Sequence, residues 1–239
     1  MREPTQICLG FTDEQWIRLR ARLGQNDEAA WDCAVEVFER RIRERFLACI
    51  EALMDADSQC DVEIARGAPP DCSTLPDDGG ERVVVPGFVI MALCSLLIET
   101  LQSFRESLDE AAEVVGPCSY PAGRCIRPVA STTEQFKKFL RLPAFGGEFN
   151  DDQVATQFVR GVRNGILHEA ETRGWVIWRE EPPGRIVERQ GDRYLLNRTE
   201  FYRALRCEFE KYLRELRDPA NTSRRRRFMK KMDDVAKEC

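Results

Sequence analysis

Histidine and paired cysteines are scarce in this chain. His168 is the only histidine among the 239 residues, and the ten cysteines include no Cys-x-x-Cys pair. Because a zinc site needs about four His, Cys or acidic ligands close together, we expect no metal ion, and no other cofactor is indicated. The cysteines are scattered through a long chain, so we expect free thiols and no disulfide framework.

A strong charge of either sign and a long apolar run are also lacking. The net charge is -5, which argues against a general nucleic-acid coat protein and limits any RNA contact to a local patch. The longest apolar stretch, residues 83–98, is interrupted by Pro86. Because a membrane span needs ~20 apolar residues, we predict a buried core helix and no membrane segment. The first residues lack the apolar run of a secretory signal, from which we expect a cytoplasmic protein.

Apolar residues recur at helical spacing along most of the chain, and good N-cap residues precede several of these segments. Thr12 and Gln15 match a capping box, Asn26 or Asp27 is the expected cap of the next helix, and Asn150 that of a later one with an acidic first turn. We predict helices that span, with their caps, about residues 12–24, 26–54, 86–115, 131–143, 150–174 and 197–217.

Loops and a small β insert are predicted between these helices. Residues 55–82 and 116–131 are polar and rich in proline and glycine, which predicts irregular loops. Three short segments within residues 175–196 are separated by turn signals and predict a small antiparallel β-hairpin or a three-stranded meander. Trp175 and Trp178 belong to the first segment, and we favour core packing over base stacking for both.

Together these elements predict a mainly α fold, a helical bundle with a small β insert. No linker separates two apolar sets, so we expect a single domain over residues 1–217. Residues 218–239 contain an arginine run from Arg224 to Arg227, which predicts a basic C-terminal tail, and Phe228, Met229 and Val235 indicate a short helix within it. We favour a solvated tail over one that contacts RNA, and both interpretations remain open.

The only histidine lies on the predicted helix 150–174. When successive residues are placed ~100° apart around a helix axis, apolar and polar side chains fall on opposite sides. The apolar stripe, which we expect to face the core, contains Phe158, Val159, Val162, Ile166 and Ala170. The polar side contains Arg160, Asn164, His168 and Glu171, with Arg163 at its border.

These residue types suit the cleavage of RNA by its own ribose 2′-OH, a reaction that needs no metal. Histidine, with an ordinary pKa of ~6.5, can take the 2′-OH proton near neutral pH, which makes His168 the candidate base. Arg163 would stabilise charge on the phosphate oxygens. Asn164 would orient the imidazole or the phosphate, and Glu171 and Arg160 are candidate orienting or binding groups. The plainer alternative is a surface histidine beside solvated arginines.

The segment Arg163-Asn164-Gly165-Ile166-Leu167-His168 resembles the motif of HEPN domains. These domains are small helical bundles in which Arg, a polar residue, a short spacer and His follow one another on a late helix. Residues 168–175 and 96–101 also resemble one bacterial branch of this superfamily, and the resemblance covers about residues 28–217. It implies a helical bundle of HEPN type.

The resemblance also implies a metal-independent endoribonuclease that acts as a homodimer, with the two motifs sharing one cleft. Arg163 and His168 would be catalytic, with Asn164 as their polar partner. A toxin-antitoxin or antiphage defence setting is implied, with an antitoxin or another companion protein. Some HEPN domains are instead catalytically silent modules for protein or nucleotide binding and dimerisation, and this alternative remains open.

One acidic residue elsewhere in the chain is a possible partner for this motif. Glu99 interrupts an apolar helix, but it shares a helical stripe with Ser95, Gln102 and Glu106. We therefore favour a solvated face over a buried partner for Arg163.

Overall fold

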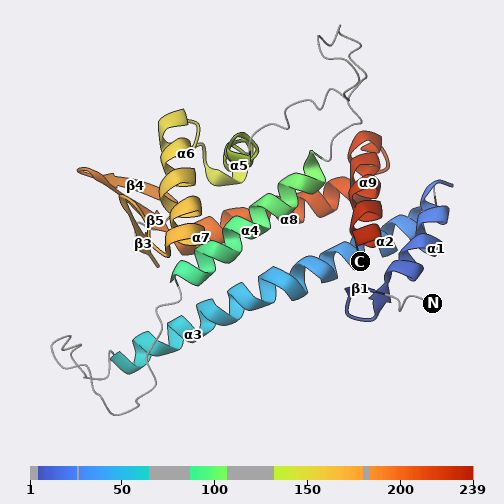
Figure 1. The fold of residues 1–239 in the computed structure, drawn as a ribbon, viewed down its shortest axis with the longest axis horizontal. Coiled ribbons are helices and arrows are strands. Elements are labelled where there is room, and N and C mark those ends of the chain that lie inside the picture. Colours follow the sequence, from blue (N-terminus) through green and yellow to red (C-terminus); the bar gives the residue numbers. More distant parts are fainter. Residues whose placement is uncertain (1–4, 26, 65–86, 107–131, 180–183, 239) are drawn as a thin grey trace, which may run out of the picture.

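Long helices and a small sheet at one end make up the fold (Figure 1). The computed structural model describes residues 5–25, 27–64, 87–106, 132–179 and 184–238. The predicted loop at 116–131 and residues 65–82 of the other predicted loop lie outside them. Over the described residues the protein is mainly helical with small β-sheets, so the predicted fold class is confirmed at this level.

The first described residues form a hairpin that leads into a short helix. Strands β1 (Gln6–Cys8) and β2 (Phe11–Thr12) pair antiparallel, and α1 (Asp13–Leu23) follows directly. The predicted capping box is confirmed, because Thr12 Oγ1 accepts a hydrogen bond from the Gln15 backbone N–H and Gln15 Oε1 accepts one from the Thr12 N–H. The hairpin was not predicted, since strands this short leave almost no periodic pattern.

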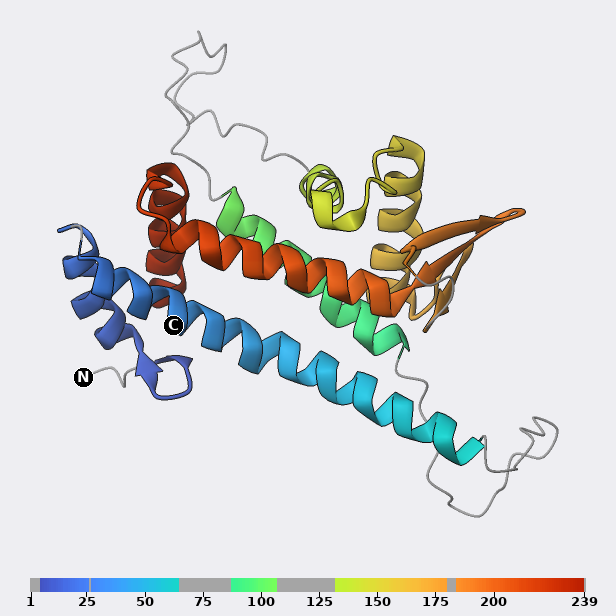
Figure 2. The ribbon, with the colours of Figure 1, turned by 180° about the vertical axis from the view of Figure 1, so that it is seen from behind.

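A long helical rod runs along one side of the molecule (Figures 1 and 2). It consists of α2 (Glu28–Ile42), a π-helical segment (Arg43–Leu47) and α3 (Ala48–Ile64). Asp27 caps the rod, with its carboxylate accepting a backbone N–H at 3.0 Å. Residues 55–64 are helical and not part of the predicted loop, because they contain no glycine or proline that would end the helix despite their polarity.

Two further long helices pack against this rod and against each other. They are α4 (Gly87–Arg105) and α8 (Arg198–Arg217). The predicted start of α8 is confirmed, since Asn197 Oδ1 accepts hydrogen bonds from two backbone N–H groups of its first turn, both at 3.1 Å. The predicted continuation of α4 over residues 107–115 lies outside the described residues.

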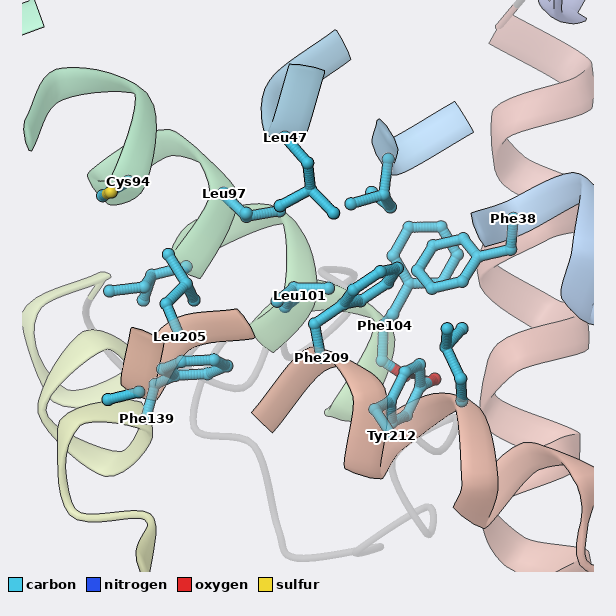
Figure 3. Packing of buried hydrophobic residues seen from close by; sticks show 14 of the residues in the cluster. Phe38, Leu47, Cys94, Leu97, Leu101, Phe104, Phe139, Leu205, Phe209 and Tyr212 are labelled. Atoms are coloured by element: carbon cyan, nitrogen blue, oxygen red, sulfur yellow. Dashed lines mark hydrogen bonds between the residues drawn. The ribbon is translucent and has the colours of Figure 1, made fainter. Parts of the chain in front are cut away.

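Aromatic side chains from different helices meet in the core (Figure 3). The ring of Phe38 lies 4.5 Å from that of Phe104 and 5.4 Å from that of Phe228, measured between centroids. The rings of Phe209 and Tyr212 lie 6.1 and 6.0 Å from Phe38. All five side chains are buried. Each such contact adds ~0.5–1.5 kcal/mol to the stabilisation from apolar burial, so this cluster fixes how the helices cross.

The C-terminal segment is a helix of the core, which differs from the basic tail predicted over residues 218–239. α9 (Thr222–Glu238) completely buries Phe228 and Met232. These two residues are four apart and share one helix face. The predicted helix around Phe228 is confirmed, but its packing in the core was not predicted, because charged residues surround the short apolar stripe.

Most of the arginine run on α9 makes contacts inside the molecule. Arg225 is buried, donates to both carboxylate oxygens of Glu28 at 2.9 and 2.7 Å, and lies 4.5 Å above the ring of Trp31. Arg224 forms a 3.1 Å ion pair with Glu215 of α8. The solvated tail that we favoured is therefore wrong for these arginines, because α9 folds back onto α2 and α8 instead of extending from them.

The β insert is a mixed three-stranded sheet. It contains β3 (Trp175–Trp178), β4 (Val187–Gln190) and β5 (Arg193–Asn197) in the order β3-β5-β4. The predicted hairpin is confirmed for β4 and β5, but β3 runs parallel to β5, so the three-stranded meander is wrong. Glu148 holds the start of β4 by accepting the backbone N–H groups of Ile186 and Val187.

α4 is long and apolar enough to cross a membrane when only its length and composition are considered. Of its most apolar window, 56% is buried inside the protein. A core helix of a folded bundle has this property as well, so the prediction of no membrane segment stays a prediction.

The cysteines whose side chains the structure describes are free thiols. They are Cys8, Cys33, Cys49, Cys94 and Cys207. Burial raises the pKa of the Cys94 thiol well above its usual range, so this side chain acts as a small apolar group of the core.

Candidate functional site

The helix that contains the motif is built from three parts. α6 (Asp152–Phe158) leads into a π-helical turn (Val159–Asn164), and α7 (Gly165–Glu169) completes it. Its cap is Asp151, whose carboxylate accepts a backbone N–H at 2.8 Å, and not the predicted Asn150. π-helical turns inside helices are frequent at functional sites, and this one contains the first two motif residues.

Two glycines four residues apart allow the chain that follows the helix to lie directly against it. The carbonyl of Gly161 accepts the N–H of Arg173 at 3.1 Å, and that of Gly165 accepts the N–H of Glu171 at 3.3 Å. A Cβ on Gly161 would come within 2.5 Å of the Arg173 carbonyl oxygen and 2.8 Å of Trp175 Cδ1, and one on Gly165 would overlap the Glu171 carbonyl oxygen. Only glycine fits at either position.

Arg163 is held by a carboxylate from α4. Its Nε donates to Glu99 Oε1 at 2.7 Å and its Nη2 donates to the same oxygen. The third nitrogen, Nη1, donates to Asn164 Oδ1 at 2.7 Å. The Arg163 and Glu99 side chains are 19% and 29% exposed, so the pair lies at the edge of the protein and not in its core.

This pair corrects the prediction that Glu99 lies on a solvated face of its helix. Ser95 and Gln102, on the same predicted polar stripe, are buried. This side of α4 is covered by other parts of the protein, because α4 packs against the motif helix. Arg163 supplies the charge that compensates the partial burial of the Glu99 carboxylate.

His168 is exposed on α7, one turn after Asn164. It forms no hydrogen bond or ion pair with any other residue that the structure describes. The fold therefore brings Arg163 and Asn164 into direct contact, and it leaves the imidazole free to meet a ligand from solvent.

Glu171 lies beyond the end of the helix and not one turn after His168 as predicted. Ala170 adopts a left-handed conformation, with φ 55°, and turns the chain away after Glu169. The apolar stripe accordingly ends at Ile166, and Ala170 is exposed. Glu171 is exposed, and only its backbone is tied to the helix.

Comparison with known proteins gives no assignment. No protein-family model matches this chain, and no curated protein or solved structure matches it. The resemblance to HEPN domains therefore stays a prediction based on the motif residues.

The two tryptophans of β3 differ in burial. Trp175 is buried and stacks on Tyr194 with ring centroids 4.7 Å apart, so the favoured core interpretation is confirmed for it. Trp178 is 46% exposed, and the core interpretation is wrong there. β3 is an edge strand of the sheet, and Trp178 is its last residue.

Chemically, the motif helix offers a fixed cation and, five residues later, an exposed imidazole. Arg163 can attract an oxyanion through its permanent charge, and His168 can exchange a proton. Within the described parts of the chain, no group of three or more His, Cys, Asp and Glu side chains is placed to hold a metal ion.

Proposed function

We propose that this protein is a metal-independent endoribonuclease. In the proposed reaction, His168 removes the proton of a ribose 2′-OH, and that oxygen attacks the adjacent phosphorus. The bond to the 5′ oxygen of the next nucleotide breaks, and that oxygen takes up a proton. The products are a 2′,3′-cyclic phosphate and a 5′-OH. Arg163 stabilises the negative charge that develops on the phosphate oxygens.

The observation that supports this proposal is the fixed orientation of Arg163, five residues before an exposed His168 on the same helix. The guanidinium is fixed through Glu99 and Asn164 before any ligand binds, so little reorganisation is needed when charge builds up on a phosphate. The polar residue of the motif thus has a physical role, since Asn164 orients the arginine.

A homodimer is part of the proposal. The reaction needs a proton acceptor and a proton donor, and one chain has a single histidine, so a second copy would supply the second imidazole. α4, which holds Glu99, also exposes Phe88, Val89 and Leu96 at 39%, 44% and 40%. Exposed apolar side chains on one helix are typical of an association surface. We propose a toxin-antitoxin or antiphage defence setting in the cytoplasm, with a companion protein.

The second candidate is a catalytically silent module for protein or nucleotide binding and dimerisation. One observation favours it. All three guanidinium nitrogens of Arg163 already donate to protein acceptors, Glu99 and Asn164. A phosphate would have to compete with these hydrogen bonds or accept from the remaining N–H group on each of Nη1 and Nη2.

The two candidates are separated by RNA cleavage in the presence of EDTA. Wild-type protein is expected to cut RNA and leave 2′,3′-cyclic phosphate ends, whereas His168→Ala is expected to be inactive. Gln153→Ala, which alters an exposed residue of α6 on the same helix, is the matched control and should cut like wild type. Equal cleavage by wild type and His168→Ala, or none by either, would eliminate the ribonuclease proposal.

A further inference from the structure

A shallow pocket of about 170 Å³ lies beside the motif helix, where that helix faces the turn between β4 and β5. Its lining combines side chains of the helix, the chain that returns after it, and the hairpin. The lining residues are Gln157, Arg160, Gly161, Arg173, Gly174, Asp192 and Tyr194. A pocket for a complete cofactor or drug-sized ligand is usually ~300–1,000 Å³, so this one suits a single unit of a longer ligand.

The charges in this pocket are available to a ligand. Arg160 is exposed and has no hydrogen bond or ion pair within the described parts of the chain. Arg173 pairs with Glu169 at 2.6 Å, but its side chain is 69% exposed, and such surface pairs are weak enough to be exchanged. Two guanidinium groups that converge on one pocket are suited to a phosphate.

The remaining polar groups favour a nucleotide over a free phosphate. The carboxylate of Asp192 would repel a small anion, but it can accept hydrogen bonds from a ribose hydroxyl or a base amino group. Gln157 adds an amide with both donors and acceptors. Tyr194 also lines the pocket, but it is only 9% exposed and its ring stacks on Trp175, so it contributes contact area to the wall and not a stacking platform for a base.

The pocket also lies close to the motif. Arg160 and Arg163 lie three residues apart in the same π-helical segment, Val159–Asn164. Arg173 is tied to Glu169, the residue after His168, and its N–H is bonded to Gly161. A strand whose phosphate meets Arg163 would therefore place a neighbouring nucleotide at the pocket.

From these contacts we infer that the pocket binds one nucleotide of single-stranded RNA next to the scissile phosphate. Arg160 and Arg173 contact its phosphate, and Asp192 and Gln157 contact its sugar or base. This inference rests on the proposed ribonuclease function and adds a substrate class to it, RNA that is unpaired beside the cleavage site. A base-paired strand would not reach the pocket with a free base.

Binding of a fluorescent single-stranded RNA tests the inference in the His168→Ala background, in which cleavage does not interfere. Arg160→Ala is expected to weaken binding about tenfold and to lower the slope of log K against log salt by about 1. Arg18→Ala removes an equally exposed arginine from α1, at the other end of the molecule, and should bind like its parent. A mononucleotide should displace the RNA, whereas inorganic phosphate at the same concentration should not.

The outcomes separate the inference from the proposed function. If RNA is cleaved by wild type and bound equally by the parent and Arg160→Ala, the pocket assignment is overturned and the ribonuclease proposal stands. If wild type neither binds nor cleaves RNA, both fail. Equal weakening by Arg18→Ala, or displacement by phosphate, would also overturn the pocket assignment, because either result indicates binding by charge alone.

Ultraviolet cross-linking locates the bound strand. A uridine-containing RNA irradiated on the His168→Ala protein is expected to modify the tryptic peptide of residues 194–198, which begins with Tyr194. Arg160→Ala should reduce this adduct about tenfold, in line with the loss of binding. Adducts confined to peptides of α9, with none at residues 194–198, would assign the RNA to another surface and refute the inference.

Discussion

Glu99 of α4 accepts hydrogen bonds from both Nε and Nη2 of Arg163, a residue 64 positions later in the chain. Hydrogen bonds between a carboxylate and a guanidinium are about twice as strong as neutral ones. The core helix α4 therefore sets the direction of the motif arginine, and it does so before a ligand arrives. In the proposed mechanism Glu99 is a positioning residue.

Replacing Glu99 by glutamine should lower the catalytic constant of RNA cleavage about tenfold with little change in KM. The amide keeps the shape of the carboxylate but weakens its bonds, so Arg163 is less well placed when charge develops in the transition state. Initial rates of cleavage over a range of RNA concentrations measure this.

The control for Glu99→Gln is Glu106→Gln, which removes the same charge one residue beyond the end of α4. Glu106 pairs with Lys138 at 3.1 Å and does not contact the motif. Its cleavage kinetics should match wild type. A rise in the rate of Glu99→Gln would contradict the positioning role, since it would mean that Glu99 restrains Arg163. A loss explained by unfolding, measured by urea titration, would also contradict it.

The glycine pair on the motif helix gives a second prediction. Gly161→Ala should destabilise the protein by ~1–3 kcal/mol, because its Cβ would overlap a backbone carbonyl that cannot move without displacing β3. Gly24→Ala is the control, since the nearest atom to a Cβ there is 3.9 Å away and its backbone is α-helical; it should be neutral or stabilising by up to about 1 kcal/mol. Urea unfolding midpoints measure both, and equal midpoints would refute the packing role.

Sequence periodicity predicted most helices here but not how they meet. The apolar stripe through Phe158, Val159 and Val162 is buried as expected, because spacing alone determines which side of a helix is apolar. The π-helical turn and the early end at Glu169 were missed. Both depend on the returning chain that packs on Gly161, and a helical wheel contains no such information.

Glu99 illustrates a second limit of sequence analysis. A carboxylate on an apolar helix is explained equally well by solvent or by a cation from a distant segment, and only the tertiary contact with Arg163 decides between them. The glycines at 161 and 165 signal a different contact, the close approach of the chain that follows the motif helix. Glycine inside a strongly helical pattern is costly and usually marks a close approach of another segment.

Phe228 tests whether α9 belongs to the core. Phe228→Ala should destabilise the protein by ~3–5 kcal/mol, because it removes a ring that contacts Phe38 and Phe104 and leaves a cavity. Arg226→Ala changes an exposed residue of the same helix and should shift stability by less than ~0.5 kcal/mol. Thermal and urea unfolding of both variants gives the comparison. A small effect of Phe228→Ala would mean that α9 is detached in solution.

The contact between Glu28 and Arg225 predicts how stability depends on pH. The hydrogen bonds from Arg225 lower the pKa of the Glu28 carboxyl below its usual 4.5. Because this pKa is lower in the folded state, the charged carboxylate stabilises the fold at pH values above the unfolded-state pKa. This stabilisation is lost as the pH falls through the folded-state pKa. Glu28→Gln cannot titrate, so its urea midpoint should lie below that of wild type at about pH 7, and the gap should close at about pH 3.

The control is Glu36→Gln, which changes an exposed glutamate of the same helix without an ion pair among the described residues. It should show no such convergence. A gap of equal size at both pH values would mean that the negative charge of Glu28 does not contribute to the stability of the protein.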